Sequence, residues 1–234
     1  EVYLDGPAAL AGLPQDYIDA HPPGPDGRIR ITTQYPDVFP ILSYARNEAT
    51  RHTVYTAFQN RAYPGNEEVL QRLLAQRYEL AQLLGFENYA QVAMADKMIG
   101  NPERAGAFIE QLASYARPAA QRDYQRQLRR LQRDDRRATA IQPWSTAYAQ
   151  ELIRREEYSL DSQAVRQYFA YNNVRDGIMT LVSDLFGVEF RPWAGAPIWH
   201  ESVEAYEVYE NGQLIGRIML DMHPREGKFS HAAN

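Results

Sequence analysis

The chain has 234 residues, of which 44% are apolar and 24% are charged, and it carries a net charge of −5 and no cysteine. The missing cysteine excludes a disulfide scaffold, a thiol nucleophile and a thiolate metal site. The acidic balance argues against nucleic acid as a partner, and no apolar run is long enough for a membrane-spanning helix. We therefore expect a folded protein that binds neither nucleic acid nor membrane.

Residues 1–36 form the first predicted part, a proline-rich opening segment with a short helix and a strand. Proline and glycine favour turns, so we expect a helical turn over residues 5–20 followed by a turn-rich loop over residues 22–27. The alternation of polar and apolar residues then predicts a short strand over residues 28–33.

Residues 37–187 form the second predicted part, an α-helical body, because apolar residues recur there at helical spacing. The predicted helices span residues 37–61, 66–85, 88–98, 101–135 and 161–187, with a weaker helical segment at 144–158. Asn66, Asn101 and Asp161 are suitable N-cap residues. The apolar side chains between Val165 and Phe186 are expected to face inward. In a chain that ends at Asn234, the helices that would pack on them are expected to be missing, so exposed apolar patches are predicted on this helix and on the hairpin.

Residues 188–234 form the third predicted part, a small β-sheet region. Two strand-like segments, residues 206–210 and 213–220, flank Asn211-Gly212, a strong signal for a hairpin. A further short strand is expected over residues 229–233. The predicted fold class is therefore mainly α, a helical body with a small antiparallel β-sheet near the C-terminus.

Residues 121–137 carry seven arginines against three aspartates. This segment is either a basic surface for an acidic partner or the solvated face of a long helix. The second interpretation is preferred because glutamine and aspartate are interleaved with the arginines. The first supports an alternative function, that of a non-catalytic helical module that binds another protein.

The segment from His200 to Glu204 looks like half of a metal-binding motif. A zinc-protease helix places two histidines four residues apart, so that both reach one ion. Here the second position is Glu204, and the segment leads into a strand, where residues four apart lie roughly 13 Å apart. We therefore expect His200 to be a partly exposed loop residue, and we assign no metal ligand.

A dense polar cluster follows the second hairpin strand and comprises Asp221, His223, Arg225, Glu226, Lys228 and His231. A catalytic Asp–His pair is conceivable, but no serine or cysteine lies in a context that would make it a nucleophile. The preferred interpretation is an ion network in which Arg225 and Lys228 flank Glu226 and hold the turn. The residues alone support no complete active site, so no catalytic residue is assigned in this chain.

The cluster belongs to the most specific of several runs that point to a known family, residues 220–228, which read Leu-Asp-Met-His-Pro-Arg-Glu-Gly-Lys. Further runs of this kind lie at residues 81–86, 88–90, 185–187, 199–203 and 206–209. Together they resemble the thimet oligopeptidase and peptidyl-dipeptidase family of zinc metallopeptidases, which includes oligopeptidase A. The resemblance covers essentially the whole chain.

The resemblance implies an almost wholly helical, two-lobed fold that encloses a deep channel. It also implies a zinc site whose His-Glu-x-x-His helix lies just downstream of residues 220–228, and this sequence contains no such motif. We therefore expect a fragment that ends just before the motif, with no bound zinc and no activity of its own. The full-length enzyme is expected to use zinc to hydrolyse short unfolded peptides through a metal-activated water.

The resemblance also suggests where the substrate binds. An extended peptide commonly adds to a sheet edge, so the expected strand over residues 229–233 is a candidate wall of the substrate channel. The candidate substrate-binding residues are Phe229, Ser230, His231 and Ala232, with a purely structural edge strand as the alternative. The full-length enzyme is expected to be monomeric and cytoplasmic, with an exported or periplasmic location as the alternative.

Overall fold

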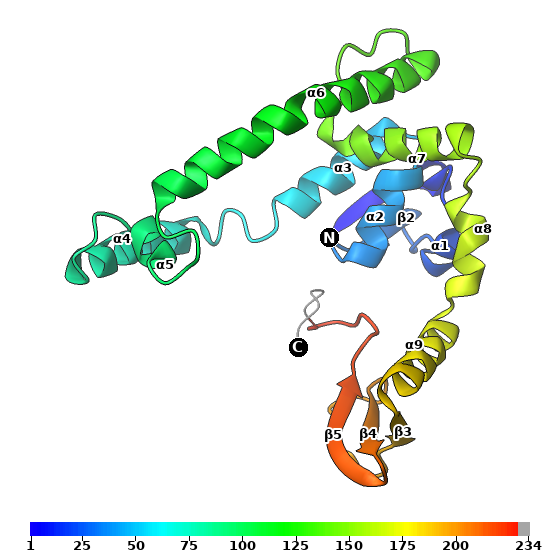
Figure 1. The fold of residues 1–234 in the computed structure, drawn as a ribbon. Helices are drawn as coiled ribbons and strands as arrows, with labels where there is room; N and C mark the ends of the chain where they lie inside the picture. The colour runs from blue at the N-terminus through cyan, green and yellow to red at the C-terminus, as the bar shows by residue number, and fades with distance from the viewer. Residues whose placement is uncertain (229–234) are drawn as a thin grey trace. The chain divides into compact units, whose positions relative to one another are not determined.

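The computed structural model describes residues 1–228, and the chain divides into two compact units, Glu1–Ser159 and Leu160–Asn234 (Figure 1). The fold is mainly α with a small antiparallel sheet near the C-terminus, which confirms the predicted fold class. The domain boundaries expected after residues 36 and 187 stay predictions. No helix within residues 1–228 has the length and apolar character needed to cross a membrane.

The N-terminal unit begins with a two-stranded sheet. Strand β1 (Val2–Asp5) pairs antiparallel with β2 (Arg28–Ile31). The connection between them contains a 3-10 turn, η1 (Pro7–Leu10), and helix α1 (Gln15–Ala20). The expected strand near residue 28 is thus confirmed, whereas β1 was missed because four residues give too short an alternation to stand out.

The segment expected to form one helix over residues 37–61 is two helices, α2 (Tyr35–Tyr44) and α3 (Glu48–Gln59). The side chain of Asn47 accepts a hydrogen bond from the backbone N–H of Ala49 (2.9 Å) and so caps the start of α3. The single-helix prediction was wrong because apolar spacing continues across the short break, where only the capping residue marks a new start.

The core of the N-terminal unit lies between the two-stranded sheet and helices α2 and α3. Its fully buried side chains come from η1, β2, α2 and α3, namely Leu10, Ile29, Ile31, Val38, Ile41 and Val54. Tyr17 of α1 completes this core, and its hydroxyl donates a hydrogen bond to the carbonyl of Asp37 (2.8 Å). The phenol thus meets a backbone acceptor where it is removed from water.

Arg51 of α3 fastens the C-terminal end of α2. Its Nη1 donates to the carbonyls of Ala45 (2.6 Å) and Arg46 (3.1 Å), and its Nη2 donates to Ser145 Oγ (3.2 Å). The guanidinium lies 4.2 Å from the ring centroid of Tyr148, and burial lowers the pKa of Arg51. Arg51 therefore supplies hydrogen-bond donors to two carbonyls of the short connection between α2 and α3.

The rest of the N-terminal unit is helical and comprises α4 (Glu67–Leu83), α5 (Tyr89–Met94), α6 (Pro102–Asp134), η2 (Pro143–Ser145) and α7 (Thr146–Glu157). Asn88 and Asn101 cap α5 and α6 by accepting hydrogen bonds from the backbone N–H groups of Gln91 and Arg104. The helices expected between residues 66 and 158 are therefore confirmed, but the expected cap at Asn66 is not, because its side chain makes no capping hydrogen bond.

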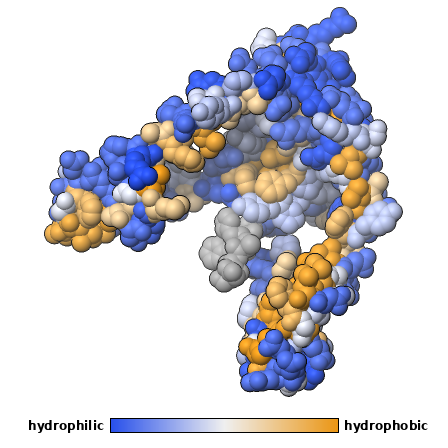
Figure 2. All heavy atoms as spheres, viewed as in Figure 1, coloured by the Kyte–Doolittle hydropathy of each residue, from blue (hydrophilic) through white to orange (hydrophobic). Residues whose placement is uncertain are grey.

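Helix α4 and the first half of α6 carry large apolar side chains that are exposed. They include Leu70, Leu74, Leu83, Phe108, Ile109 and Leu112. Figure 2 shows apolar side chains gathered on the surface around α4. The apolar stripe of α4 thus exists, but the described part of this unit does not cover it.

The C-terminal unit contains α8 (Ser162–Arg166), η3 (Gln167–Phe169), α9 (Tyr171–Phe186), β3 (Val188–Pro192), β4 (Glu204–Glu210) and β5 (Gln213–Leu220). The single helix expected over residues 161–187 is interrupted at Ala170, whose ψ of 139° lies outside the helical region. Asp161 caps α8 by accepting from the N–H of Gln163 (2.9 Å), and Gly187 ends α9 in the left-handed conformation, as expected for a helix stop.

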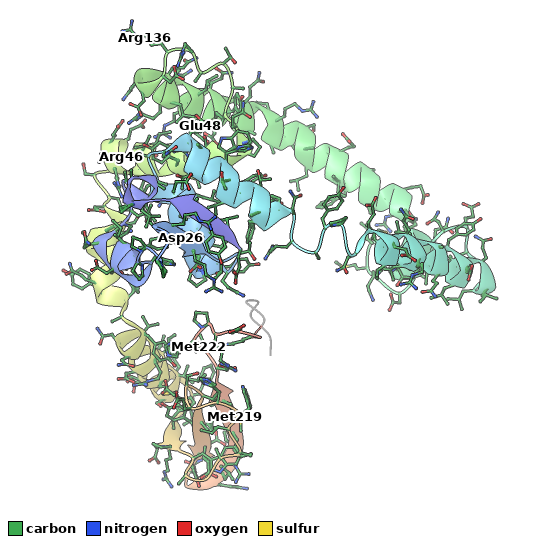
Figure 3. All side chains as sticks on the ribbon, turned by 180° about the vertical axis from the view of Figure 1, so that it is seen from behind. Asp26, Arg46, Glu48, Arg136, Met219 and Met222 are labelled. Carbon is green, nitrogen blue, oxygen red and sulfur yellow. The ribbon has the colours of Figure 1, made fainter. Side chains whose placement is uncertain are left out.

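Strands β3, β4 and β5 form an antiparallel sheet in that order. The turn between β4 and β5 has φ angles of +50° at Asn211 and +80° at Gly212. Both values are positive, as the tightest hairpin turns require, so the predicted hairpin is confirmed. Met219 lies near the end of β5 and Met222 on the segment that leaves the sheet (Figure 3).

The apolar face of the last helix is exposed instead of packed. Its exposed side chains are Ile178, Leu181, Leu185 and Phe186, and Val165 of α8 and Phe169 of η3 are exposed as well. Figure 2 shows an apolar surface in the region of α9. Within the described residues, the expected exposure of the apolar face of this helix is therefore found. Periodicity locates the apolar face of a helix, but it carries no information on whether a partner covers that face.

Candidate functional site

The first polar cluster of the C-terminal unit, the Glu204 hub, lies where β4 begins. Oε1 of Glu204 accepts a hydrogen bond from the hydroxyl of Tyr171 (2.8 Å), and Oε2 accepts from the hydroxyl of Tyr206 (2.6 Å). Oε2 also accepts from Nη1 of Arg175 (2.6 Å). Tyr171 and Arg175 are four residues apart on α9, so the helix presents both side chains to the same carboxylate.

These contacts fix the protonation states of the hub. Hydrogen bonds from Tyr206, Tyr171 and Arg175 lower the pKa of Glu204. Burial, together with the bond to Glu204, raises the pKa of Tyr171 to about 12 and also raises that of Tyr206. Near neutral pH the hub therefore holds one carboxylate, one guanidinium and two neutral phenols. Such an arrangement braces α9 against β4 and is poorly suited to proton transfer.

The second cluster, the Asp221 knot, follows β5 directly. Oδ1 of Asp221 accepts from Nη1 of Arg225 (2.6 Å) and Nζ of Lys228 (3.0 Å). Oδ2 accepts from Nη2 of Arg225 (2.9 Å) and Nε1 of Trp199 (3.1 Å). The hydrogen bonds from Arg225 above all, and those from Lys228 and Trp199, hold the pKa of Asp221 well below its usual range. The carboxylate is therefore a weak base whose acceptor sites are already used.

Lys228 ties the end of the segment 221–228 to its beginning through further hydrogen bonds. Its Nζ also donates to the carbonyls of Asp221 (2.5 Å) and His223 (2.9 Å), and its backbone N–H donates to the carbonyl of Arg225 (3.2 Å). Nζ of Lys228 thus has three acceptors, Oδ1 of Asp221 and the carbonyls of Asp221 and His223, which match the three N–H donors of its ammonium group. Gly227 has a φ of +76°, which glycine adopts without strain. Residues 221–228 thus form a loop whose last residue is tied back to its first.

His223 joins the two clusters. Its ring lies edge-on to the ring of Tyr171, with the centroids 4.8 Å apart and an interplanar angle of 65°. Edge-to-face contacts of this kind favour one relative placement of two rings. The hub and the knot therefore form one continuous network that links α9, β4 and residues 221–228.

The half motif at His200 does not form a metal site. Nδ1 of His200 lies 2.9 Å from Oγ of Ser202 and accepts the backbone N–H of Ser202 (3.1 Å). Both carboxylate oxygens of Glu204 are engaged in the hub. Within residues 1–228, no three His, Cys, Asp or Glu side chains are grouped so that they could hold a metal ion. The described residues therefore do not fit a zinc centre.

The predicted substrate-binding residues, Phe229, Ser230, His231 and Ala232, lie outside the described residues, and their role stays a prediction. The ion network expected around Glu226 exists, but its centre is Asp221, and Glu226 is exposed. Sequence reasoning missed the Glu204 hub. Its signal was the spacing of Glu204 and Tyr206, because residues two apart on a strand share one face.

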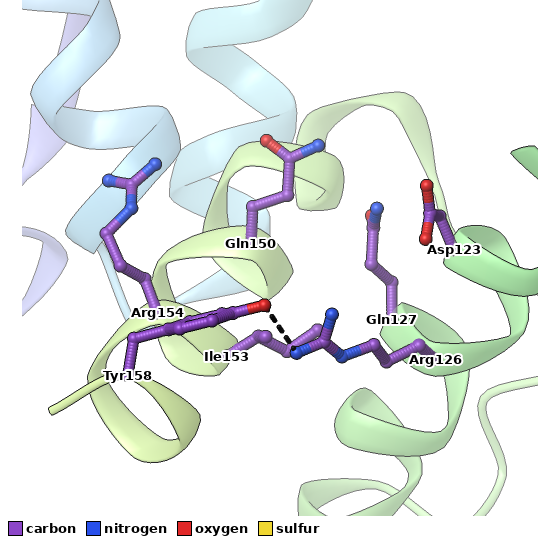
Figure 4. A pocket seen from close by; sticks show the side chains of 7 residues that line it. All are labelled: Asp123, Arg126, Gln127, Gln150, Ile153, Arg154 and Tyr158. Carbon is purple, nitrogen blue, oxygen red and sulfur yellow. Dashed lines mark hydrogen bonds between the residues drawn. The ribbon is translucent and has the colours of Figure 1, made fainter. Parts of the chain in front are cut away.

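The arginine-rich segment supplies the other candidate site, in the N-terminal unit. Side chains of α6 and α7 and the residue after α7 line a pocket there (Figure 4): Asp123, Arg126, Gln127, Gln150, Ile153, Arg154 and Tyr158. Arg126 pairs with Glu157 and donates to the hydroxyl of Tyr158 (3.2 Å), and Arg130 pairs with Glu156 (2.6 Å). These arginines hold α6 against α7, which favours a structural role over a basic surface for a partner.

Comparisons with known proteins place these features in context. Residues 41–234 match the family model described as Peptidase family M3. The chain is 33% identical to Oligopeptidase A of Salmonella typhimurium over 94% of this chain and 34% of that protein. It is 30% identical to the Probable thimet oligopeptidase of Arabidopsis thaliana over 95% of this chain and 32% of that protein. It is 28% identical to Saccharolysin of Saccharomyces cerevisiae over 88% of this chain and 30% of that protein. The chain thus spans about a third of the length of these curated relatives.

Proposed function

The chain belongs to peptidase family M3, and from this premise we propose that it is part of a zinc-dependent oligopeptidase that hydrolyses short, unfolded peptides. The observation that carries the proposal is the match to Oligopeptidase A over 94% of this chain, at 33% identity. Relatives named as oligopeptidases in bacteria and plants support the same reaction class.

We propose that zinc binds to residues of the complete protein that lie outside this segment. The bound metal would activate the attacking water and polarise the scissile carbonyl. A catalytic zinc needs about three protein ligands, and residues 1–228 offer no such group. On this proposal the 234-residue chain is inactive alone, and its contribution to the complete enzyme is to shape the peptide-binding site.

We further propose that Phe229, Ser230, His231 and Ala232 contact the peptide substrate. Main-chain hydrogen bonds to an extended segment would align a peptide with little regard to its side chains. Small residues such as Ser230 and Ala232 would permit a close approach of the two backbones. The support is their place in the sequence. They come directly after Lys228, whose Nζ donates to Oδ1 of Asp221 (3.0 Å).

Metal analysis and peptide cleavage test the proposal directly. The complete protein should carry zinc in stoichiometric amount and cleave a quenched fluorescent peptide of about ten residues, and a chelator should abolish the cleavage. The 234-residue chain should do neither. Stoichiometric zinc with turnover by the 234-residue chain would contradict the proposal that the zinc ligands lie outside this segment. A complete protein without peptidase activity would contradict the proposed function.

We also propose that the complete protein is a cytoplasmic monomer. The name of one relative, Probable cytosolic oligopeptidase A of Arabidopsis thaliana, supports the compartment. Fractionation of cells and sedimentation of the complete protein test the two statements separately.

A further inference from the structure

We propose that the cavity between α3, α6 and α7 binds a small aliphatic carboxylate, with exposed Arg46 and buried Arg51 supplying the positive charge that attracts it. The cavity has a volume of about 190 Å³, and all of its lining residues belong to the N-terminal unit. That volume is below the roughly 300 to 1,000 Å³ of pockets that hold drug-sized ligands, so the occupant must be small. The inference concerns binding and does not depend on the proposed function.

Arg51 is the buried charge of this cavity. Only 4% of the residue is exposed, and its Nε is shielded from water without a hydrogen-bond partner among residues 1–228. A buried donor without a partner is costly, and such groups are rare in folded proteins. Burial also lowers the pKa of Arg51, because the neighbouring groups compensate only part of the lost hydration. An anion in the cavity would offset this cost by electrostatic attraction, even without touching Arg51 directly.

Arg46 provides the second positive charge from a backbone that is held on both sides. Its N–H donates to the carbonyl of Ala11 (2.8 Å), and its own carbonyl accepts from Nη1 of Arg51 (3.1 Å). The residue is exposed, and within residues 1–228 no carboxylate pairs with its side chain. A guanidinium can donate two parallel hydrogen bonds to a carboxylate. Arg46 therefore lines the cavity as an unpaired cation on a fixed backbone.

Two of the three acidic residues that line the cavity already pair with arginines. Oδ2 of Asp134 accepts a hydrogen bond from Nη1 of Arg130 (2.9 Å). Oδ1 of Asp135 accepts the backbone N–H of Arg137 (2.9 Å) and lies 3.4 Å from Nε of the same residue. Each of these carboxylates therefore has a counter-charge beside it, which weakens its repulsion of an anion in the cavity.

Glu48 is the remaining acidic residue of the lining. One of its oxygens accepts a hydrogen bond from the uncharged indole of Trp144 (2.9 Å). Once the paired carboxylates are set aside, the two cations Arg46 and Arg51 stand against this one anion, which leaves one positive charge in excess. A single positive charge suits a monovalent anion such as a carboxylate better than a doubly charged phosphate.

The rest of the lining suits a carboxylate that carries a short aliphatic group. Leu131, Ala138 and Ala140 supply apolar surface. Oγ of Ser145 accepts from Nη2 of the buried arginine (3.2 Å) and keeps its own proton for another acceptor. The ring of Tyr148 lies 4.2 Å from the same guanidinium, and its hydroxyl is a further donor of the lining. Positive charge, hydroxyl donors and apolar surface together match a molecule such as propionate.

Protection of Arg46 from phenylglyoxal, a reagent that modifies accessible guanidinium groups, tests the site in the complete protein. Peptide mapping by mass spectrometry reads Arg46 and Arg136 separately in one sample. Arg136 is the internal control, because it is also exposed but is not a lining residue (Figure 3). Propionate should slow the labelling of Arg46 about five-fold or more relative to chloride at equal ionic strength, and it should leave Arg136 unchanged.

Two variants test whether the protection comes from the cavity. Ala140→Leu places a larger side chain in the lining and changes no charge, so propionate should no longer protect Arg46. Thr139→Leu is the matched control, since Thr139 is not a lining residue, and it should keep the protection. Both positions are exposed, so both variants should fold.

Four outcomes overturn the inference. Labelling of Arg46 that propionate does not slow shows that no carboxylate binds there, and equal slowing of Arg46 and Arg136 shows a general effect of the salt. Equal protection by chloride and propionate shows a site for an adventitious ion only. Protection that persists in Ala140→Leu places the anion outside the cavity. None of these readouts uses peptide cleavage, so the proposed function is tested separately.

Discussion

Leu10, Ile31 and Val38 of the N-terminal unit are fully buried, whereas Val203 is the one buried apolar residue in the described part of the C-terminal unit. The second unit instead concentrates hydrogen-bonded charged side chains in the Glu204 hub and the Asp221 knot. Apolar burial is non-directional and grows with area, while hydrogen-bonded ion pairs are directional and depend on charge state. The two units therefore differ in what they tolerate: the first should be sensitive to side-chain volume and the second to charge.

The largest expected effect comes from the core of the N-terminal unit. Ile41→Ala removes buried volume from a fully buried site and should lower the free energy of unfolding by about 2 to 5 kcal/mol. Ile178→Ala is the matched control, because Ile178 is 56% exposed on α9, and its effect should stay within about 0.5 kcal/mol. Urea unfolding of both variants checks the difference. Equal losses would contradict the exposed position of Ile178.

Arg51 should give the next largest effect. Arg51→Met keeps the length of the side chain but leaves the carbonyls of Ala45 and Arg46 without their donor. Unsatisfied buried acceptors make a loss of about 1 to 3 kcal/mol in unfolding free energy the expected result. Thermal unfolding followed by circular dichroism measures it. A variant as stable as the wild type would contradict the role of Arg51 at the end of α2.

On the arginine-rich segment the expected loss of stability is smaller, and it depends on whether an arginine bonds to α7 or faces solvent. Arg130 is 10% exposed and bonds to both Glu156 and Asp134, whereas the side chain of Arg137 is 93% exposed. Arg130→Gln should cost about 1 to 2 kcal/mol of unfolding free energy, and Arg137→Gln should cost nothing measurable. If both variants lose the same stability, the contact between α6 and α7 does not depend on Arg130.

The smallest effect on global stability is a pH dependence that originates in the knot. The folded state lowers the pKa of Asp221 from its ordinary 3.8, so folding favours the ionised carboxylate. Its contribution to stability is complete above that ordinary value and is lost as the pH falls through the lower folded pKa. The difference in unfolding free energy between wild type and Asp221→Asn should therefore shrink as the pH falls from about 5 to 2. A difference that does not change with pH would contradict the lowered pKa.

Much of the fold could be predicted from the sequence, because local signals sufficed. The hairpin at Asn211-Gly212 needs a positive φ at both turn residues, and few other pairs of residues supply it. The start of α6 at Asn101 and the end of α9 at Gly187 likewise follow from capping chemistry. The breaks at Asn47 and Ala170 were missed, because apolar periodicity runs across an interruption of a few residues.

The candidate site was less predictable, because its contacts join residues distant in the chain. Their closeness in the sequence grouped Asp221, Arg225 and Lys228 in one polar cluster. That Asp221 and not Glu226 is its centre depends on which side chains turn inward. The hub brings Tyr171 to Glu204 across thirty-three positions of sequence, and no local pattern records that pairing. The family to which the chain belongs followed from the resemblance of runs such as residues 220–228, and these contacts do not carry that information.

Amide hydrogen exchange, read residue by residue in wild type, Asp221→Asn and Glu226→Gln at neutral pH, tests the central contrast most directly. We predict that Asp221→Asn removes protection from the Lys228 amide, which donates to the carbonyl of Arg225, and leaves the amides of β1 and β2 unchanged. Glu226→Gln should match the wild type throughout. Unchanged protection at Lys228, or an equal loss in β1 and β2, would contradict the view that charge holds this loop while apolar burial holds the N-terminal unit.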